Sequence, residues 1–306
     1  MIDRLTRRFL GALVGTAAAL FVLSGCVVQQ QRPITRLYAE KATAEVPADE
    51  LLDVGVRLFD PNIPENEAER EKKRVFPDVR HAESRYIPTL IRDTLEDTGQ
   101  WGAARVVPSS VNSFDMTVDA KIVESNGAYL KLEVTAHDAT GKVWIDKKEY
   151  EGQADTRVYR DNYTAGRDPF ENVYVLIAND LLAVRNTKTA TDLANIRHVS
   201  EMRFAADFAP VAFSQYLSQN KKSGEYKVLR LPAEDDVLVK RINQIRERDY
   251  GMIDTVSENY TAFSERLEER RIPERGQFRV LHHVVRELRH ERARRVLFGN
   301  PVCRDR

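Results

Sequence analysis

Six histidines and two cysteines are the side chains of this 306-residue chain best suited to acid–base, nucleophilic or metal chemistry. His137 precedes Asp138, and a neighbouring carboxylate can orient an imidazole for proton transfer. The pair stands beside a turn, however, where a structural role is the simpler interpretation. His198 has no carboxylate or nucleophile at a fixed spacing, and the His282-His283 pair is not repeated at a spacing that would complete a zinc site. We therefore predict no catalytic residue, no metal site and no cofactor.

Short motifs that carry enzymatic chemistry are missing from the sequence. It contains no CxxC pair, no HExxH, no GxSxG and no GxxxxGK[ST] phosphate loop. We expect a protein that is not an enzyme. A hydrolase of unrecognised design stays open as an alternative, which would require His137, Asp138 and another polar side chain in a deep cleft.

The thiol of Cys26 stands in a context that suits lipid attachment. Three arginines (Arg4, Arg7 and Arg8) precede a largely apolar run of 15 residues, from Phe9 to Leu23. A membrane-spanning helix needs about 20 apolar residues. A basic start followed by a shorter apolar run is typical of a secretory signal peptide that ends just before Cys26.

The four residues Leu23-Ser24-Gly25-Cys26 resemble the lipobox of bacterial lipoproteins. The resemblance implies diacylglycerol transfer to the Cys26 thiol, cleavage before Cys26, and acylation of the new amino terminus, for example with palmitate. Each buried methylene contributes about 0.8 kcal/mol, so several acyl chains together anchor a protein permanently. Val27, where inner-membrane lipoproteins of enteric bacteria carry aspartate, implies an outer-membrane lipoprotein that faces the periplasm.

Charge and cysteine content narrow the class of partner. The chain has 47 basic and 47 acidic residues, and loss of residues 1–25 leaves 44 and 46. Nucleic-acid binding rests on clustered cations, so we expect no nucleic-acid partner. With Cys26 acylated, Cys303 has no cysteine left for an intramolecular disulfide.

Composition and periodicity divide the chain into five segments. We predict a lipoprotein signal peptide over residues 1–25, a polar tether over 26–48, an α/β domain over 49–155, a helical region over 156–270 and an arginine-rich tail over 271–306. The tail holds ten arginines and no lysine. It is either a basic, flexible appendage for anionic lipid or an oddity of the gene such as a shifted reading frame, and no function rests on it.

Alternating apolar residues predict the strands of the α/β domain. One strand is expected near 52–58, a brief one at 105–107, and three antiparallel strands within 115–150. Asn126-Gly127 is a strong hairpin signal, and a second turn is expected at Thr140-Gly141. A helix that begins close to Pro88 and ends near Gly99 should cover the apolar face of the sheet, with Trp101 packed beneath it. The charged run 65–74 indicates a solvated loop or a short exposed helix.

Helical spacing dominates the second half of the chain. A helix should open at Asp168-Pro169-Phe170-Glu171, and another should run from 192 to 208, break at Pro210 and resume to about 219. Residues 226–231 indicate a short strand or an extended link. A long amphipathic helix is expected over 234–270, interrupted near Asp249 and Gly251. That helix either packs on its own domain or mediates oligomerisation or partner binding, and the sequence leaves both open.

One loop combines aromatic and cationic side chains that could bind a ligand or a partner: Arg157, Tyr159, Arg160, Tyr163 and Arg167. Such a mixture can bind polyanions or glycans, although a loop pinned to its own surface would look the same. We keep it as the candidate ligand or partner surface.

The order strand, helix, strand and three antiparallel strands over 51–150 resembles a small α/β module of periplasmic lipoproteins. The resemblance lies in the layout of residues 86–92, Gly99-Gln100-Trp101 and Val106-Val107-Pro108. Examples of the module are the curli-secretion lipoprotein, the auxiliary lipoproteins of transport systems and the amino-terminal domain of the Tol propeller protein. The resemblance implies a topology and carries no functional residue.

We therefore predict an α+β fold, in which a mixed sheet with an antiparallel meander is covered by helices and followed by a mostly α-helical region that ends in a long amphipathic helix. The expected function is that of a non-enzymatic lipoprotein, anchored through Cys26, that contacts an envelope protein or a second copy of itself. The alternative is a periplasmic binding lipoprotein for glycan, lipid or a transport substrate.

Overall fold

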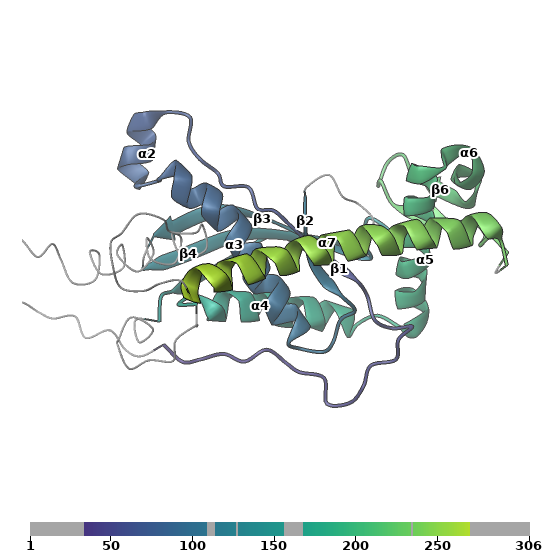
Figure 1. The fold of residues 1–306 in the computed structure, drawn as a ribbon, viewed down its shortest axis with the longest axis horizontal. Helices are drawn as coiled ribbons and strands as arrows, with labels where there is room; N and C mark the ends of the chain where they lie inside the picture. Colours follow the sequence, from purple (N-terminus) through teal and green to yellow (C-terminus); the bar gives the residue numbers. More distant parts are fainter. Residues whose placement is uncertain (1–33, 109–113, 127, 156–167, 234, 270–306) are drawn as a thin grey trace, which may run out of the picture. The chain divides into compact units, whose positions relative to one another are not determined.

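A five-stranded mixed sheet forms the centre of the computed structural model (Figure 1). The structure describes residues 34–108, 114–126, 128–155, 168–233 and 235–269. The strands are β1 (Val54–Arg57), β2 (Ala104–Val107), β3 (Met116–Asn126), β4 (Tyr129–Asp138) and β5 (Val143–Gln153), in the spatial order β2-β1-β3-β4-β5. β1 runs parallel to both neighbours, whereas β3, β4 and β5 form an antiparallel meander. The predicted α+β class and mixed sheet are confirmed.

Side-chain alternation makes one face of this sheet apolar, as the sequence predicts. Val118, Ile122, Leu132 and Val134 on β3 and β4 are buried in the main core, and Lys131 and its polar neighbours lie on the opposite face. A strand that is apolar on one side must be covered on that side to be stable. The covering elements are two helices.

The first covering helix, α3 (Pro77–Glu96), begins about ten residues earlier than the sequence predicts and contains Pro88 in its interior. An internal proline leaves the carbonyl four residues before it without a helical partner. Here the Ser84 carbonyl instead accepts a hydrogen bond from the Phe59 backbone N–H, at 3.0 Å. The chain leaving β1 therefore satisfies the group that Pro88 frees, which explains why the helix continues through the proline.

The second covering helix, α4 (Glu171–Arg185), packs beside α3 and against β5. Its buried stripe joins the same core as Ile87, Ile91 and Trp101: Phe170, Val173, Tyr174, Ile177 and Leu181. The predicted helix start at Pro169 is two residues too early, because Asp168 instead closes a turn by accepting from the Phe170 N–H and Phe170 is the N-cap. One core thus joins the predicted α/β domain to the first helices of the predicted helical region.

Two turns connect the meander. Asn126 pairs with Tyr129 and accepts from the Ala128 and Tyr129 N–H groups, so it ends β3 and caps the hairpin. At the second turn Gly141 has φ +89°, a conformation that favours glycine. The edge strand β5 is irregular, since its register with β4 shifts near Ala136 and Lys147 has φ +43°.

Smaller elements complete the described chain: α2 (Glu67–Lys73), α5 (Ala190–Phe208), α6 (Pro210–Phe213), a 3-10 turn (Ser214–Tyr216), β6 (Leu217–Gln219) and β7 (Tyr226–Val228). The charged α2 is a short exposed helix, one of the two predicted forms. The expected helix up to 219 is wrong beyond Phe213, because β6 pairs with β7 in a second, two-stranded sheet. A satellite core of Met202, Ala205, Phe213 and Ile242 joins α5, α6 and the second sheet to the long helix that follows.

The last described element is α7 (Val237–Glu269), 33 residues without a break. The predicted interruption is therefore wrong. Asp249 and Gly251 are exposed and nothing lies close to the glycine, so its cost is the propensity loss of about 1 kcal/mol. Within the described ranges, no helix combines the length and apolar composition that crossing a membrane requires.

Residues 34–50 contain neither helix nor strand, yet they are held to the body. The Ala42 N–H donates to the Thr98 carbonyl, and Arg197 and Arg185 donate to the carbonyls of residues 48 and 50. In Figure 1 this segment runs along α4 toward α5. The predicted tether of 26–48 thus belongs to the folded body from Thr35 onward, and residues 26–33 lie outside the described ranges.

Candidate functional site

The residues that the sequence singles out for function lie outside the described ranges. These are the lipidation site Cys26 and the five loop residues Arg157, Tyr159, Arg160, Tyr163 and Arg167. Candidate sites in the structure therefore come from its buried polar clusters and its exposed apolar side chains.

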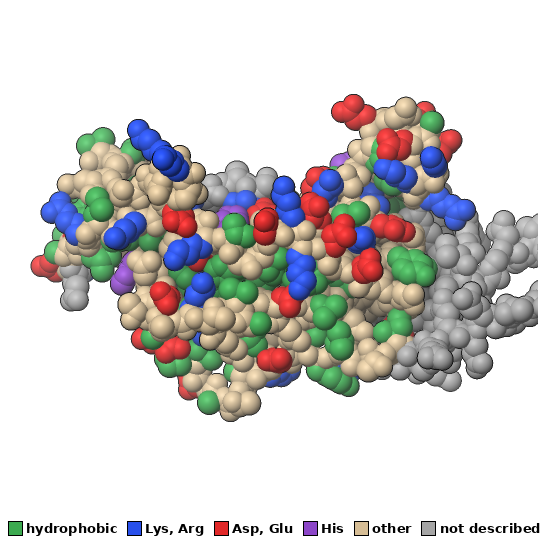
Figure 2. Space-filling view, turned by 180° about the vertical axis from the view of Figure 1, so that it is seen from behind, with side chains coloured by type: hydrophobic (Ala, Val, Ile, Leu, Met, Phe, Trp, Pro, Cys, Tyr) green, Lys and Arg blue, Asp and Glu red, His purple; other side chains and the backbone are tan. Residues whose placement is uncertain are grey.

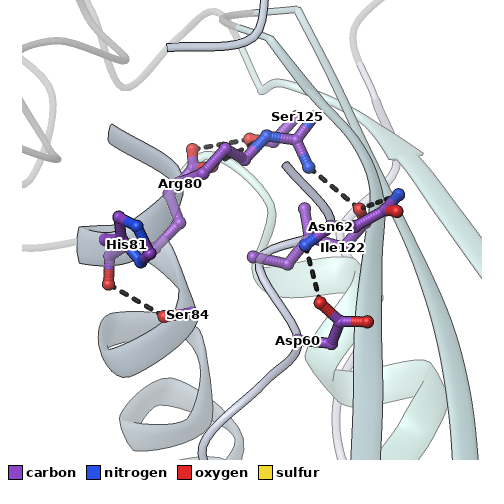
Figure 3. Close-up of polar contacts among 8 residues, drawn as sticks. Asp60, Asn62, Arg80, His81, Ser84, Ile122 and Ser125 are labelled. Atoms are coloured by element: carbon purple, nitrogen blue, oxygen red, sulfur yellow. Dashed lines mark hydrogen bonds and ion pairs between the residues drawn. The ribbon is translucent and has the colours of Figure 1, made fainter. Parts of the chain in front are cut away.

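The first polar cluster joins α3 to β3 (Figure 3). Arg80 and Glu83 are both almost fully buried, at 3% and 1% exposure. The Ser125 hydroxyl donates to a Glu83 oxygen at 2.6 Å, and the Arg80 guanidinium donates to the Ile122 carbonyl at 2.9 Å. Asn62 donates to that same carbonyl at 3.1 Å.

The carbonyl of Ile122 is available because the register of β3 with β4 shifts between Ile122 and Glu124. A bulge of this kind takes a backbone group out of the ladder. Arg80 is also 3.8 Å from the second Glu83 oxygen. Because an unmatched buried charge is very costly, we interpret this cluster as a structural contact that holds α3 to β3. Ser125 donates its hydroxyl to the Glu83 carboxylate and is only 3% exposed, which is consistent with a structural role.

The second polar cluster holds α7 to the body. The Arg246 guanidinium donates to the Ser200 hydroxyl at 2.7 Å and to the Tyr250 hydroxyl at 2.9 Å, and lies 3.6 Å from an Asp115 oxygen. The other Asp115 oxygen accepts from the Asp53 N–H at 2.9 Å. Burial raises the pKa of Asp115, and the nearby Arg246 opposes that rise. This cluster ties Asp53, which precedes β1, and residues of α5 and α7 around one carboxylate.

Aromatic contacts extend this attachment along α7. The ring of Tyr250 stacks on Phe114 with centroids 5.1 Å apart, and the Arg105 guanidinium lies 4.5 Å from the Tyr250 ring centroid. Arg105 on β2 also forms a two-bond ion pair with Asp254, at 2.7 and 2.8 Å. Burial raises the pKa of Tyr250 to about 12, so the hydroxyl stays protonated. Arg246, Tyr250 and Asp254 share one face of the helix and fix it to the sheet.

His137 and Asp138 do not form a catalytic pair. The Asp138 carboxylate is 1% exposed and holds the turn, accepting from the Thr140 N–H and from the Trp144 indole at 2.8 Å. The His137 ring points to the opposite face of the sheet, 3.9 Å from Asp119. Burial lowers the pKa of His137, which favours the neutral ring at pH 7. Among the described residues there is no group of three metal-ligating side chains.

Exposed apolar side chains gather on the elements around the satellite core. Fourteen large hydrophobic residues are exposed within the described ranges, and six of them fall in 31 consecutive positions. We call these six the satellite surface: Phe208, Val211, Leu229, Leu231, Val237 and Leu238. Val211 is fully exposed and Val237 is 71% exposed. Figure 2 shows hydrophobic and cationic side chains beside one another at the end that carries α6.

Sequence reasoning missed the satellite surface, although its residues are apolar and close in sequence. The sequence predicts only a strand or a link over 226–231 and only a helix through Phe208, and neither prediction marks an exposed apolar surface. All six residues lie outside β6 and β7, on α5, α6, the segment after β7 and the start of α7. One local signal was available: Val211 follows Pro210 in a four-residue helix that buries only Phe213.

Comparison with known proteins identifies no relative: no family model, no curated protein and no solved structure matches this chain. The resemblances to the lipobox and to the periplasmic α/β module therefore remain predictions.

Proposed function

We propose that this protein is a lipoprotein of the bacterial cell envelope, anchored at the periplasmic face of the outer membrane by acylated Cys26, and that it works by binding another protein. The satellite surface is the observation that carries the binding role. Single exposed hydrophobic residues are ordinary, whereas a concentration of them on one small subdomain indicates an interaction site.

The position of the satellite surface favours a protein partner over the anchoring membrane. Thr35, the first residue held by α4, lies at the amino-terminal end of that helix, and in Figure 1 this end is opposite α6 and β6. The chain that follows Cys26 therefore enters the described body at the end opposite α6 and β6.

Charge suggests the character of the partner. Lys221, Lys222, Lys227 and Arg230 lie on or beside the β6–β7 hairpin, with Glu225 the acidic residue among them. Asp207 precedes Phe208, and Asp235 and Asp236 precede Val237, so the satellite surface is flanked by charges of both signs. We therefore expect a partner, either another envelope protein or a second copy of this chain, with an apolar contact and an acidic patch that faces the β6–β7 hairpin.

Anchoring and binding are tested separately. Radiolabelled palmitate should label the wild-type protein, and the Cys26→Ser variant should stay unlabelled and leave the membrane fraction. For binding, the acylated protein is crosslinked in cells and recovered in mild detergent, with Val211→Asp as the test variant. Val143→Asp is the matched control, because Val143 is also exposed but lies on β5.

Val211→Asp should reduce the recovered partner or homo-oligomer at least tenfold, while Val143→Asp should leave it unchanged. An unpartnered monomer in the wild type, or equal loss in both variants, would count against a binding role for the satellite surface. Sedimentation of the Cys26→Ser protein with anionic vesicles, lost in Val211→Asp, would assign the surface to lipid instead.

A further inference from the structure

Two asparagines on α4 grip the segment 35–42, which we call the strap. The side-chain amide of Asn172 bridges two backbone groups: its oxygen accepts from the Leu37 N–H at 2.9 Å, and its nitrogen donates to the Thr35 carbonyl at 2.9 Å. Both groups flank Arg36, so one amide holds the backbone on either side of a single residue.

Asn179 repeats the arrangement one step further along. Its oxygen accepts from the Glu40 N–H at 2.9 Å, and its nitrogen donates to the Tyr38 carbonyl at 3.2 Å. The two asparagines are seven positions apart on the helix, which is about 10.5 Å at 1.5 Å per residue. The gripped groups are three residues apart on the strap, which is about 10 Å in extended chain. Because these two spacings are nearly equal, both asparagines can bind the extended strap at the same time.

The two asparagines bind backbone groups of the strap rather than its side chains. Tyr38 is 70% exposed, Thr35, Arg36 and Glu40 are exposed as well, and the strap contributes no residue to the buried core clusters. An exposed ion pair, Arg36 with Glu171 at 3.0 Å, adds little because water screens it. Segments with few buried apolar contacts open locally at low free-energy cost.

We propose that the strap can detach from α4 and thereby lengthen the chain between the lipid anchor and the folded body. If Cys26 carries the proposed anchor, eight residues separate it from Thr35 in the docked state, and these nine residue steps span at most about 30 Å. Release of the two asparagine grips moves the first fixed point to Ala42, which is held by the Thr98 carbonyl. Ala42 is sixteen residue steps from Cys26, which is a span of at most about 55 Å. A partner held farther from the membrane would select the released state.

The first test uses hydrogen exchange on the mature Cys26→Ser protein. The Leu37 amide should exchange at least tenfold more slowly than in an unstructured peptide. Glu40→Pro removes the N–H that Asn179 accepts and should return the Leu37 amide to the unstructured rate. Glu40→Ala keeps that N–H and should leave the protection in place.

The helix side of the grip is tested in the same way. Asn179→Ala should raise the exchange rate of the Leu37 amide, and Asn243→Ala, at an exposed position on α7, is the control for the same chemical change. An unprotected Leu37 amide in the parent protein, or equal protection in the proline and alanine variants, would overturn the proposal. Circular dichroism checks that each variant keeps the fold.

The second test measures height above a bilayer. The acylated protein is reconstituted in vesicles, and energy transfer from a label on the body to a bilayer dye is compared for Glu40→Pro and Glu40→Ala. The proline variant should show lower transfer, because its body can move outward. Equal energy transfer in the two anchored variants would refute the proposed lengthening of the tether. Failure of the acylated protein to bind vesicles at all would refute the lipid anchor.

Discussion

Replacement of Arg246 by methionine tests how the long helix α7 is held. Methionine keeps the length and apolar stem of the side chain but removes the guanidinium. The change deletes hydrogen bonds to Ser200 and Tyr250 and leaves the Asp115 carboxylate, which is 3% exposed, without its cation.

The expected loss follows from burial. Removing one member of a buried ion pair costs about 3–5 kcal/mol, because the remaining charge stays in a poor environment. For a folded body of this size, about 2–4 °C of melting temperature is lost per kcal/mol. We therefore expect Arg246→Met to lower the melting temperature by on the order of 10 °C.

The sign of the pH dependence identifies the cause. Burial already raises the folded-state pKa of Asp115 above its unfolded value, and loss of Arg246 raises it further. A group with a raised folded pKa stabilises the protein below its unfolded pKa, about 3.9, and this stability is lost as the pH rises through the folded pKa. The deficit of Arg246→Met should thus be largest at pH 7 and shrink as the pH falls.

Urea unfolding of the mature Cys26→Ser protein at several pH values measures both effects. Adding Asp115→Asn to Arg246→Met removes the orphaned charge but keeps an oxygen for the Asp53 N–H, so it should recover part of the loss at pH 7. A deficit that is independent of pH, and no recovery in the double variant, would refute this account of the cluster.

Three further variants probe other parts of the fold. Gly55→Ala places a Cβ about 2.8 Å from the Phe114 ring, and overpacking of this kind should cost about 1–3 kcal/mol in urea unfolding; an unchanged midpoint would show that the ring moves freely. Thr189→Ala removes the capping box that Thr189 shares with Asp192 on α5, which should cost about 1 kcal/mol, and a loss below 0.3 kcal/mol would contradict the cap. The folded-state pKa of His137 is lowered by burial, so its contribution to stability is present above the unfolded pKa of about 6.5 and is lost as the pH falls through the folded value. His137→Gln should flatten the stability profile below pH 6.5, and an identical profile would refute the assignment.

Local patterns were sufficient to predict the sheet. Strict alternation in residues 116–122 and 130–136 specifies strands with one buried face, and helical spacing around Ile87 specifies their cover. These signals depend on near neighbours in the sequence. The same holds for Trp101, which is buried in the main core as expected.

Long-range partners account for most of what the sequence did not predict. The start of α3 was placed close to Pro88, since the group that compensates the proline, the Phe59 N–H, lies 29 positions earlier. The Arg246 cluster joins residues up to 193 positions apart, from Asp53 to Arg246. Asn172 and Asn179 are polar residues on a helix surface, and nothing local shows that they hold a backbone. Pairing partners of this kind become visible only in the folded chain.

The irregular β5 has a consequence for how copies of this protein meet. Among the described residues no strand pairs with its outer edge, where another molecule could add a strand and start aggregation. The left-handed Lys147 and the charged side chains around it, among them Asp146, Lys148 and Glu149, interrupt that template. Crowded neighbours would therefore meet a kinked, charged border, and copies could accumulate at high density without joining edge to edge.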